Sequence, residues 1–134
     1  MKVKIVNILE KDNEYYVKIK SDYGAICGVW KEGKPILNKD YYIEFSVEEP
    51  LELNKNLFIN NNNNNNIHSI FMENDKIILN GQYDSLDEDG CLAIKLGKSI
   101  ILLDYITNKE NINITDCNLM LKLSSIQIFN TNLI

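Results

Sequence analysis

The regular alternation of apolar and polar side chains is the feature that most constrains how this chain can fold. It is clearest where apolar or aromatic residues occupy every second position, at Tyr41, Ile43, Phe45 and Val47. The intervening positions hold Tyr42, Glu44, Ser46 and Glu48. Successive side chains of a β-strand point to opposite faces, so this pattern predicts a strand with one buried and one solvated face. Pro50, which cannot donate to a sheet ladder, ends it.

Short apolar runs separated by turn residues recur along the rest of the chain. Asp12-Asn13, Asn74-Asp75, Asp89-Gly90 and Gly97-Lys98 each separate two such runs, which is typical of β-hairpin turns. No segment has a sustained apolar period near 3.6, so at most one short helix is expected. We predict an all-β single domain over residues 1–134, an antiparallel barrel or sandwich of roughly eight to ten strands.

Two segments interrupt the strand pattern. Residues 60–66 are all asparagine and predict a flexible, Asn-rich surface loop. The alternation that begins at Leu119 changes phase at Ser124-Ser125, which is the pattern that a β-bulge produces.

Two hairpins within the chain resemble one another. Leu9 to Ile19 aligns without gaps with Leu86 to Leu96, each read as a strand, an acidic turn and a second strand with one lysine at the same place. A duplicated β-meander would produce this similarity. So would chance likeness between two hairpins of one turn class, and the sequence leaves both interpretations open.

The balance of charge bears on the class of partner. The chain has 19 acidic and 14 basic residues, a net charge of −5, and every basic residue is lysine. Arginine supplies the bidentate contacts used for phosphates and base edges, so nucleic-acid binding is disfavoured, with a local basic stripe left open. An acidic surface suits a basic protein partner, because complementary fields accelerate association. Mild acidity also serves solubility alone.

The sequence has no segment that is typical of a signal peptide or of a membrane span. The first residues lead straight into an alternating strand pattern, unlike a signal peptide. The longest apolar run, Ile100 to Leu103, is too short to cross a bilayer. Cys27, Cys91 and Cys117 are odd in number and widely spaced, which argues against a disulfide framework. We therefore expect a cytoplasmic protein without a membrane partner.

Catalytic, metal and cofactor signatures are also missing. His68 is the only histidine, and no potential metal ligand lies near it in sequence. Residues 85–90 resemble the start of a calcium loop, but the closing ligand position holds Leu96 instead of glutamate. A Cys–His nucleophile pair, as in a small hydrolase, is a formal alternative. We predict a non-enzymatic protein with no catalytic residue, no metal site and no cofactor.

Exposed aromatic and acidic side chains are the best candidates for contact with a partner. Tyrosine and tryptophan dominate interface hot spots, and strand alternation forces one member of each Tyr-Tyr pair outward. With glutamates of the same region they form the predicted partner-binding residues, Tyr16, Trp30, Tyr42, Glu44, Glu48 and Glu49. The alternative is a solvated sheet face whose tyrosines lie flat on their neighbours.

The segment from Gly81 to Leu102, with Gly81-Gln82-Tyr83 and Asp89-Gly90-Cys91 followed by Leu92 to Leu102, resembles a small bacterial β-barrel. It is similar to the OB-like modules among immunity proteins that accompany polymorphic or contact-dependent toxins. The resemblance implies an OB-like barrel and a cognate toxin as partner, commonly a basic nuclease, neutralised by charge and shape complementarity. It transfers no functional residue. It also implies a rival, oligonucleotide binding on an aromatic sheet face.

Overall fold

A computed structural model describes residues 1–60, 68–103 and 113–131, and in these ranges the chain forms eleven β-strands and no helix. The expected all-β fold with a barrel is confirmed. The number of strands is slightly above the expected range, because the last apolar segment is divided between two sheets. The described residues contain no helix that could span a membrane.

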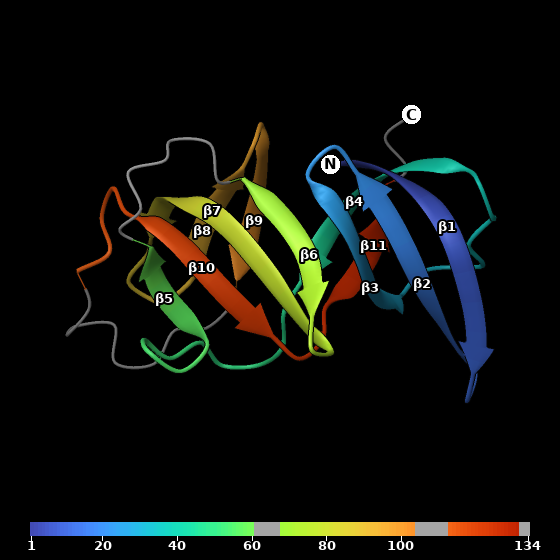
Figure 1. The fold of residues 1–134 in the computed structure, drawn as a ribbon, viewed down its shortest axis with the longest axis horizontal. Coiled ribbons are helices and arrows are strands. Elements are labelled where there is room, and N and C mark those ends of the chain that lie inside the picture. The colour runs from blue at the N-terminus through green and yellow to red at the C-terminus, as the bar shows by residue number, and fades with distance from the viewer. Residues whose placement is uncertain (61–67, 104–112, 132–134) are drawn as a thin grey trace.

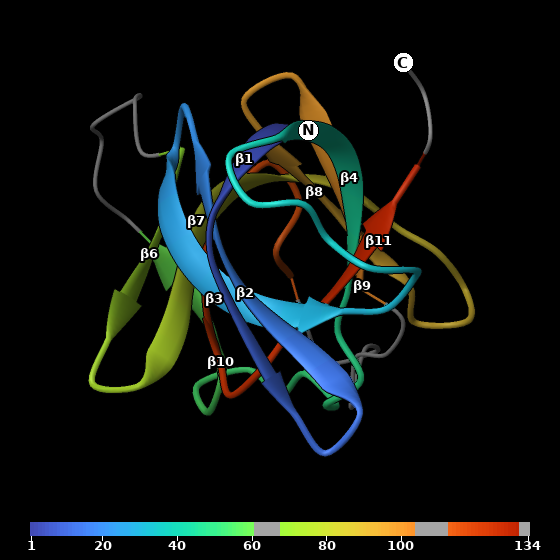
Figure 2. The same cartoon turned by 90° about the vertical axis from the view of Figure 1, so that its right-hand side faces the viewer.

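Five strands close into a barrel at one end of the molecule (Figure 2). They are β1 (Lys2–Lys11), β2 (Glu14–Ser21), β3 (Gly24–Trp30), β4 (Asp40–Ser46) and β11 (Gln127–Asn130). Their order is β1-β2-β3-β11-β4, and β4 pairs back onto β1. All neighbours are antiparallel except β3 and β11, which run parallel. The wholly antiparallel expectation is wrong at this pair, because β11 enters from the other sheet and not through a hairpin.

Six strands form a second sheet at the other end of the molecule (Figure 1). They are β5 (Leu57–Asn60), β6 (Ser69–Glu73), β7 (Lys76–Leu86), β8 (Leu92–Leu96), β9 (Ser99–Leu103) and β10 (Asn118–Leu123). The order is β5-β10-β7-β8-β9. The long β7 pairs with β6 along its first half and with β8 along its second half.

The inward faces of both sheets contribute to one continuous hydrophobic cluster. In β4 the alternation places Tyr41, Ile43 and Phe45 in this cluster and leaves Tyr42 and Glu44 exposed, as predicted. Burial of alternate apolar side chains supplies most of the favourable free energy of folding in such a barrel.

The hairpin turns are also confirmed. Asp12 and Asn13 both have positive φ, 53° and 63°, as do Asn74 and Asp75, at 50° and 63°. Two-residue turns with positive φ at both positions match the right-handed twist of the flanking strands, and Asn and Asp adopt them at low cost.

Two irregular segments complete the description of the chain. The phase change at Ser124-Ser125 is not a bulge, because β10 ends before it in one sheet and β11 begins after it in the barrel. Of the asparagine tract, Asn60 is the last residue of β5, and residues 61–66 lie outside the described part of the chain.

Candidate functional site

The predicted acidic and aromatic surface begins on the outer side of β4. Tyr42 is 47% exposed, and Glu44 and Glu48 are also exposed. Lys2 of β1 lies directly opposite Tyr42, and its ammonium group is 4.0 Å from the Asp40 carboxylate. A lysine therefore borders this surface on one side.

Glu49 is engaged by the protein's own backbone. Its Oε1 atom accepts a hydrogen bond of 2.6 Å from the backbone N–H of Ser124, in the segment that joins β10 to β11. A carboxylate that accepts a backbone N–H is a strong local anchor. The structure therefore gives Glu49 a role in holding two segments together. Of the three predicted glutamates, Glu44 and Glu48 are the exposed ones.

Trp30 lies in the barrel core, where it is only 4% exposed. Its ring packs edge-on against Tyr41 with 4.8 Å between centroids, and its indole N–H donates to the Glu32 carbonyl oxygen at 2.7 Å. The reason is the phase of β3, which turns Ile26 and Trp30 inward and Cys27 outward. The expectation that Trp30 offers contact area to a partner is therefore corrected.

Tyr16 is exposed as expected, but it belongs to a different surface from Tyr42. In the β1–β2–β3 sheet it lies opposite Leu9 on one side and Val29 on the other. Its hydroxyl donates to the Glu14 carboxylate at 3.2 Å, and this hydrogen bond and the negative charge of Glu14 raise the pKa of Tyr16. At neutral pH the ring is therefore uncharged and presents no phenolate to an anion.

Four exposed lysines cover the outer side of β1 and β2 beside Tyr16, and we call this surface the lysine face: Lys2, Lys4, Lys18 and Lys20. Lys4 and Lys20 are direct cross-strand partners. Like charges directly opposite one another destabilise a sheet, so this pair lowers stability in the free protein. An anion placed between them would remove that penalty.

Two surface hollows adjoin the lysine face. One has a volume of about 400 Å³ and is lined by Lys2, Lys4 and Lys20 together with Asp22 and Asp40. Its lysines outnumber its carboxylates, so it has the polarity and charge to receive an anionic group.

The second hollow is more apolar and has a volume of about 320 Å³. Its lining includes Leu9, Tyr16, Lys18 and Cys27. A flat apolar group placed there would contact the Tyr16 side chain with a lysine beside it. The two hollows lie on the same outer side of β1 and β2, one against Lys20 and the other against Lys18.

The sequence contains a signal for this surface that net charge conceals. The first 40 residues carry eight lysines and six acidic residues, a net charge of +2. The remaining 94 carry six lysines and thirteen acidic residues, a net charge of −7, which together give the overall −5. The alternation Lys2-Val3-Lys4-Ile5 places both lysines on one face. A count of charged residues made separately for each face of each predicted strand would have revealed this surface.

The remaining candidates from the sequence have structural roles. His68 accepts a hydrogen bond from the backbone N–H of Gly97 through Nδ1. The Asp87 carboxylate accepts the backbone N–H groups of Asp89 and Cys91, which makes residues 87–91 a hairpin turn. Within the described ranges, no group of three or more His, Cys, Asp or Glu side chains is placed to hold a metal ion.

No protein-family model, no curated protein and no solved structure matches this chain. Function is therefore inferred from the geometry of the lysine face and of the outer side of β4.

Proposed function

We propose that this protein is a binding module whose OB-like barrel holds a single-stranded nucleic acid on the lysine face. The observation that carries the proposal is the row of lysines on β1 and β2, with Lys4 opposite Lys20 and Lys18 next along the strand beside Tyr16. A five-stranded barrel closed by one parallel pair supports the OB-like description. In OB-folds the face formed by the second and third strands binds oligonucleotides. Of the lysine face, the part on β2, with Tyr16, Lys18 and Lys20, belongs to that face, and Lys2 and Lys4 of β1 extend it.

The chemistry of the surface favours a strand whose bases are free. Lysine ammonium groups contact phosphate oxygens as point charges and release counterions, which supplies affinity without reading sequence. The hollow beside Tyr16 suits one unstacked base, because stacking on an aromatic ring accepts any base. The lack of arginine removes the bidentate contacts that read base edges, so little sequence preference is expected.

The test is fluorescence-anisotropy titration with labelled single-stranded oligonucleotides at several salt concentrations. We expect the logarithm of the binding constant to fall with the logarithm of salt with a slope of about −2, as for three phosphate contacts. Replacing Tyr16 by alanine should weaken binding roughly five- to 150-fold, since stacking on one base contributes about 1–3 kcal/mol.

Phe71→Ala is the matched control, because Phe71 is an exposed aromatic residue on β6 of the other sheet. It should leave the affinity unchanged. No binding at low salt, or equal losses in the Tyr16 and Phe71 variants, would remove the proposal. Preference for a duplex of the same length would replace the single-stranded ligand with a double-stranded one.

The outer side of β4 supports a second candidate, an immunity-type inhibitor that binds a basic cognate toxin. Tyr42 and Glu44 are exposed there, Glu48 is exposed just after the strand, and residues 41–134 carry the chain's excess of negative charge. Exposed aromatic rings and acidic side chains suit a basic protein surface. A cytoplasmic location fits either candidate, since none of the three cysteines forms a disulfide.

For this candidate the measurement is capture of partners from host lysate by the tagged protein, at low and moderate salt, with identification by mass spectrometry. A single basic protein recovered in equal amount should be lost when Glu44 and Glu48 are both replaced by lysine. Such a protein, retained by the double variant, would place the interface elsewhere and reject the β4 surface.

A further inference from the structure

The barrel and the second sheet contain the same arrangement of four strands. In the barrel the order is β3-β2-β1-β4, and in the sheet it is β9-β8-β7-β10. In both, the first three strands along the chain form an antiparallel meander, and the fourth pairs antiparallel with the other edge of the first. We call β1–β4 the first unit and β7–β10 the second unit.

The match extends to the register. The first strand of each unit contains an irregularity, between Ile5 and Asn7 in β1 and between Tyr83 and Ser85 in β7. The residue before it begins a row across three strands in both units, Ile5, Ile19 and Ile26 in the first and Tyr83, Ile94 and Ile101 in the second. This register makes Ile19 equivalent to Ile94, so the ungapped alignment of the two hairpins, which matches Ile19 to Leu96, is wrong by two residues on the second strand.

The turns that follow are also equivalent. The residue two positions beyond the row on the second strand of each unit pairs with the third strand. These pairs are Ser21 with Gly24 in the first unit and Leu96 with Ser99 in the second. Each pair encloses a two-residue turn. In the first strand, the residue two positions before the row pairs with the fourth strand, as Val3 with Tyr41 and Gly81 with Leu119.

Each unit is extended by a fifth strand, and in each case that strand follows the other unit in the sequence. β5 follows β4 of the first unit directly but pairs antiparallel with β10 of the second. β11 follows β10 of the second unit but pairs antiparallel with β4 of the first. In Figure 1 the green segment after β4 runs to the far end of the second sheet, and the red β11 lies among the blue strands.

We infer that the chain contains two copies of one β-unit that have exchanged their fifth strands. In an unexchanged tandem pair, β5 would complete the first unit and β11 the second. A consequence is that neither unit has all its strands unless the other is folded. The exchange therefore makes the barrel that carries the lysine face depend on the second sheet.

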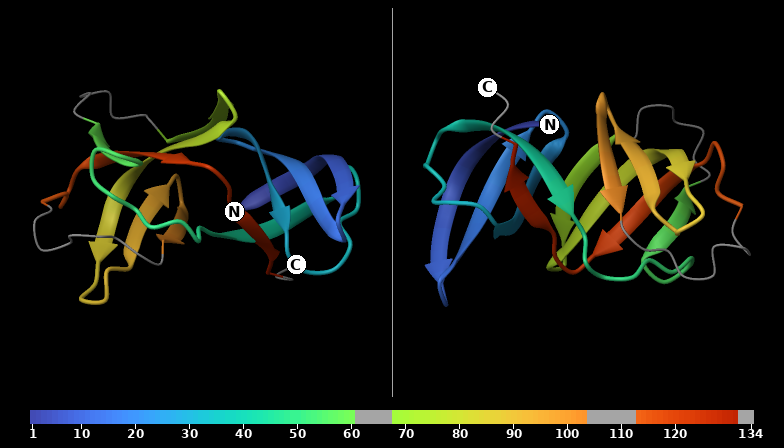
Figure 3. Two further views of the ribbon diagram at one scale, coloured as in Figure 1. Left: turned by 90° about the horizontal axis from the view of Figure 1, so that it is seen from below. Right: turned by 180° about the vertical axis from the view of Figure 1, so that it is seen from behind.

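Contacts between the units fit this arrangement. The equivalent two-residue turns meet, with Tyr23 of the first packed against Gly97 of the second, whose φ is +62° and where any Cβ would overlap the tyrosine ring. The two crossing links also touch, through the hydrogen bond from Ser124 N–H to the Glu49 carboxylate. Figure 3 shows both links passing between the barrel and the sheet.

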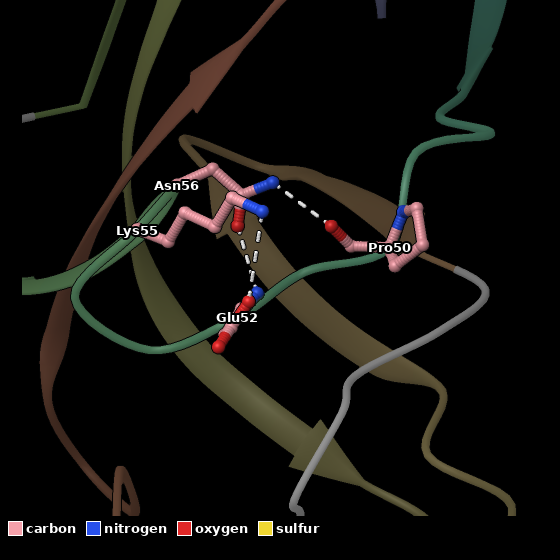
Figure 4. A network of polar contacts seen from close by, with 4 residues as sticks. All are labelled: Pro50, Glu52, Lys55 and Asn56. Atoms are coloured by element: carbon pink, nitrogen blue, oxygen red, sulfur yellow. Dashed lines mark hydrogen bonds and ion pairs between the residues drawn. The ribbon is translucent and has the colours of Figure 1, made fainter.

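The link from β4 to β5 has a defined shape of its own. Asn56 donates through Nδ2 to the Pro50 carbonyl oxygen at 2.9 Å and accepts the Glu52 N–H through Oδ1 at 2.7 Å (Figure 4). The Lys55 ammonium lies 3.8 Å from the Glu52 carboxylate. These contacts hold the chain in a compact turn immediately before β5.

The test of the inference is to destabilise the second sheet by mutation and to follow the unfolding of the barrel. Leu121 of β10 is fully buried and pairs with both β5 and β7. Trp30, the single tryptophan, reports on the barrel core by fluorescence. Leu121→Ala should lower the urea midpoint of the Trp30 transition by about 1 M or more. The exposed neighbour Lys122, replaced by alanine, should leave it unchanged.

A disulfide then separates strand exchange from ordinary packing between the sheets. Glu44 and Phe129 are cross-strand partners of β4 and β11, at a Cα separation that a disulfide spans. With the native cysteines replaced by serine, Glu44→Cys and Phe129→Cys would lock β11 onto the first unit. In the oxidised form, Leu121→Ala should lower the Trp30 midpoint by less than half as much as in the reduced form.

An equal effect in both forms, or no effect in either, would overturn the inference. Should Leu121→Ala not fold, the half-buried Met120 on the same strand, replaced by alanine, provides a milder variant for the same comparison. The readout is independent of any ligand, so it stands or fails separately from the proposed nucleic-acid binding.

Discussion

Replacing Gly24 by alanine is expected to destabilise the protein by roughly 3 to 5 kcal/mol. Gly24 has a φ of +136°, which side chains rarely permit, and a Cβ built there would overlap the carbonyl oxygen of Ile70 on β6. The neighbouring Ile70 N–H donates to the Tyr23 carbonyl oxygen at 2.9 Å, so the two backbones are held close. Neither backbone can withdraw without loss of this bond between the barrel and the second sheet.

The measurement is the free energy of unfolding from urea titration followed by Trp30 fluorescence. Gly33→Ala is the matched control, because Gly33 also has a positive φ, +72°, but nothing lies within 4 Å of where its methyl group would be. It should cost only the backbone strain, about 1 kcal/mol. If both variants lose the same stability, close approach of β6 to Gly24 is not what selects glycine there.

Replacing Lys20 by glutamate is expected to change stability and binding in opposite directions. A glutamate at this position would face Lys4 across the strands, turning a repulsive pair into an attractive one, and should stabilise the fold by about 0.5 kcal/mol. The same change removes a cation from the lysine face and adds a charge that repels phosphate. Affinity for a single-stranded oligonucleotide should fall roughly ten- to a hundredfold at low salt.

The two readouts are urea unfolding and oligonucleotide titration on the same preparation. Lys98→Glu makes an identical change of charge at an exposed lysine in the turn between β8 and β9, and should alter the affinity less than about twofold. Equal losses for Lys20 and Lys98 would mean that net charge governs binding and that the lysine face is not the site. Reduced stability in the Lys20 variant would contradict the repulsion inferred for the Lys4–Lys20 pair.

Local chemistry made much of the fold predictable. The alternation in β4 depends only on the period of a strand, and the structure buries Tyr41 and Ile43 and exposes Tyr42 as expected. The turn at Asp12-Asn13 depends only on residues that accept positive φ, and it forms where predicted. Both features are decided by residues within a few positions of one another, so a single sequence contains the information for them.

The candidate site was only partly predictable, because a surface is made by neighbouring strands. Tyr16 was expected outside and is outside, but its setting among lysines follows from the pairing of β1 with β2, which places Lys4 against Lys20. Trp30 was expected to be available to a partner and is buried against Tyr41, a residue of another strand. Net charge summed over the chain obscured the difference between its first 40 residues and the rest.

The sequence by itself therefore determined most of the strands, the buried face of β4 and the hairpin turns. Tertiary structure alone decided which strands share a sheet. The phase change at Ser124-Ser125 marks the passage of the chain from β10 in one sheet to β11 in the other, although a bulge gives the same local pattern. The physical reason is that a strand's hydrogen-bonding edges are the same for every partner. The choice among partners depends on contacts between residues far apart in sequence, such as Phe45 with Ile128 and Leu121 with Leu57.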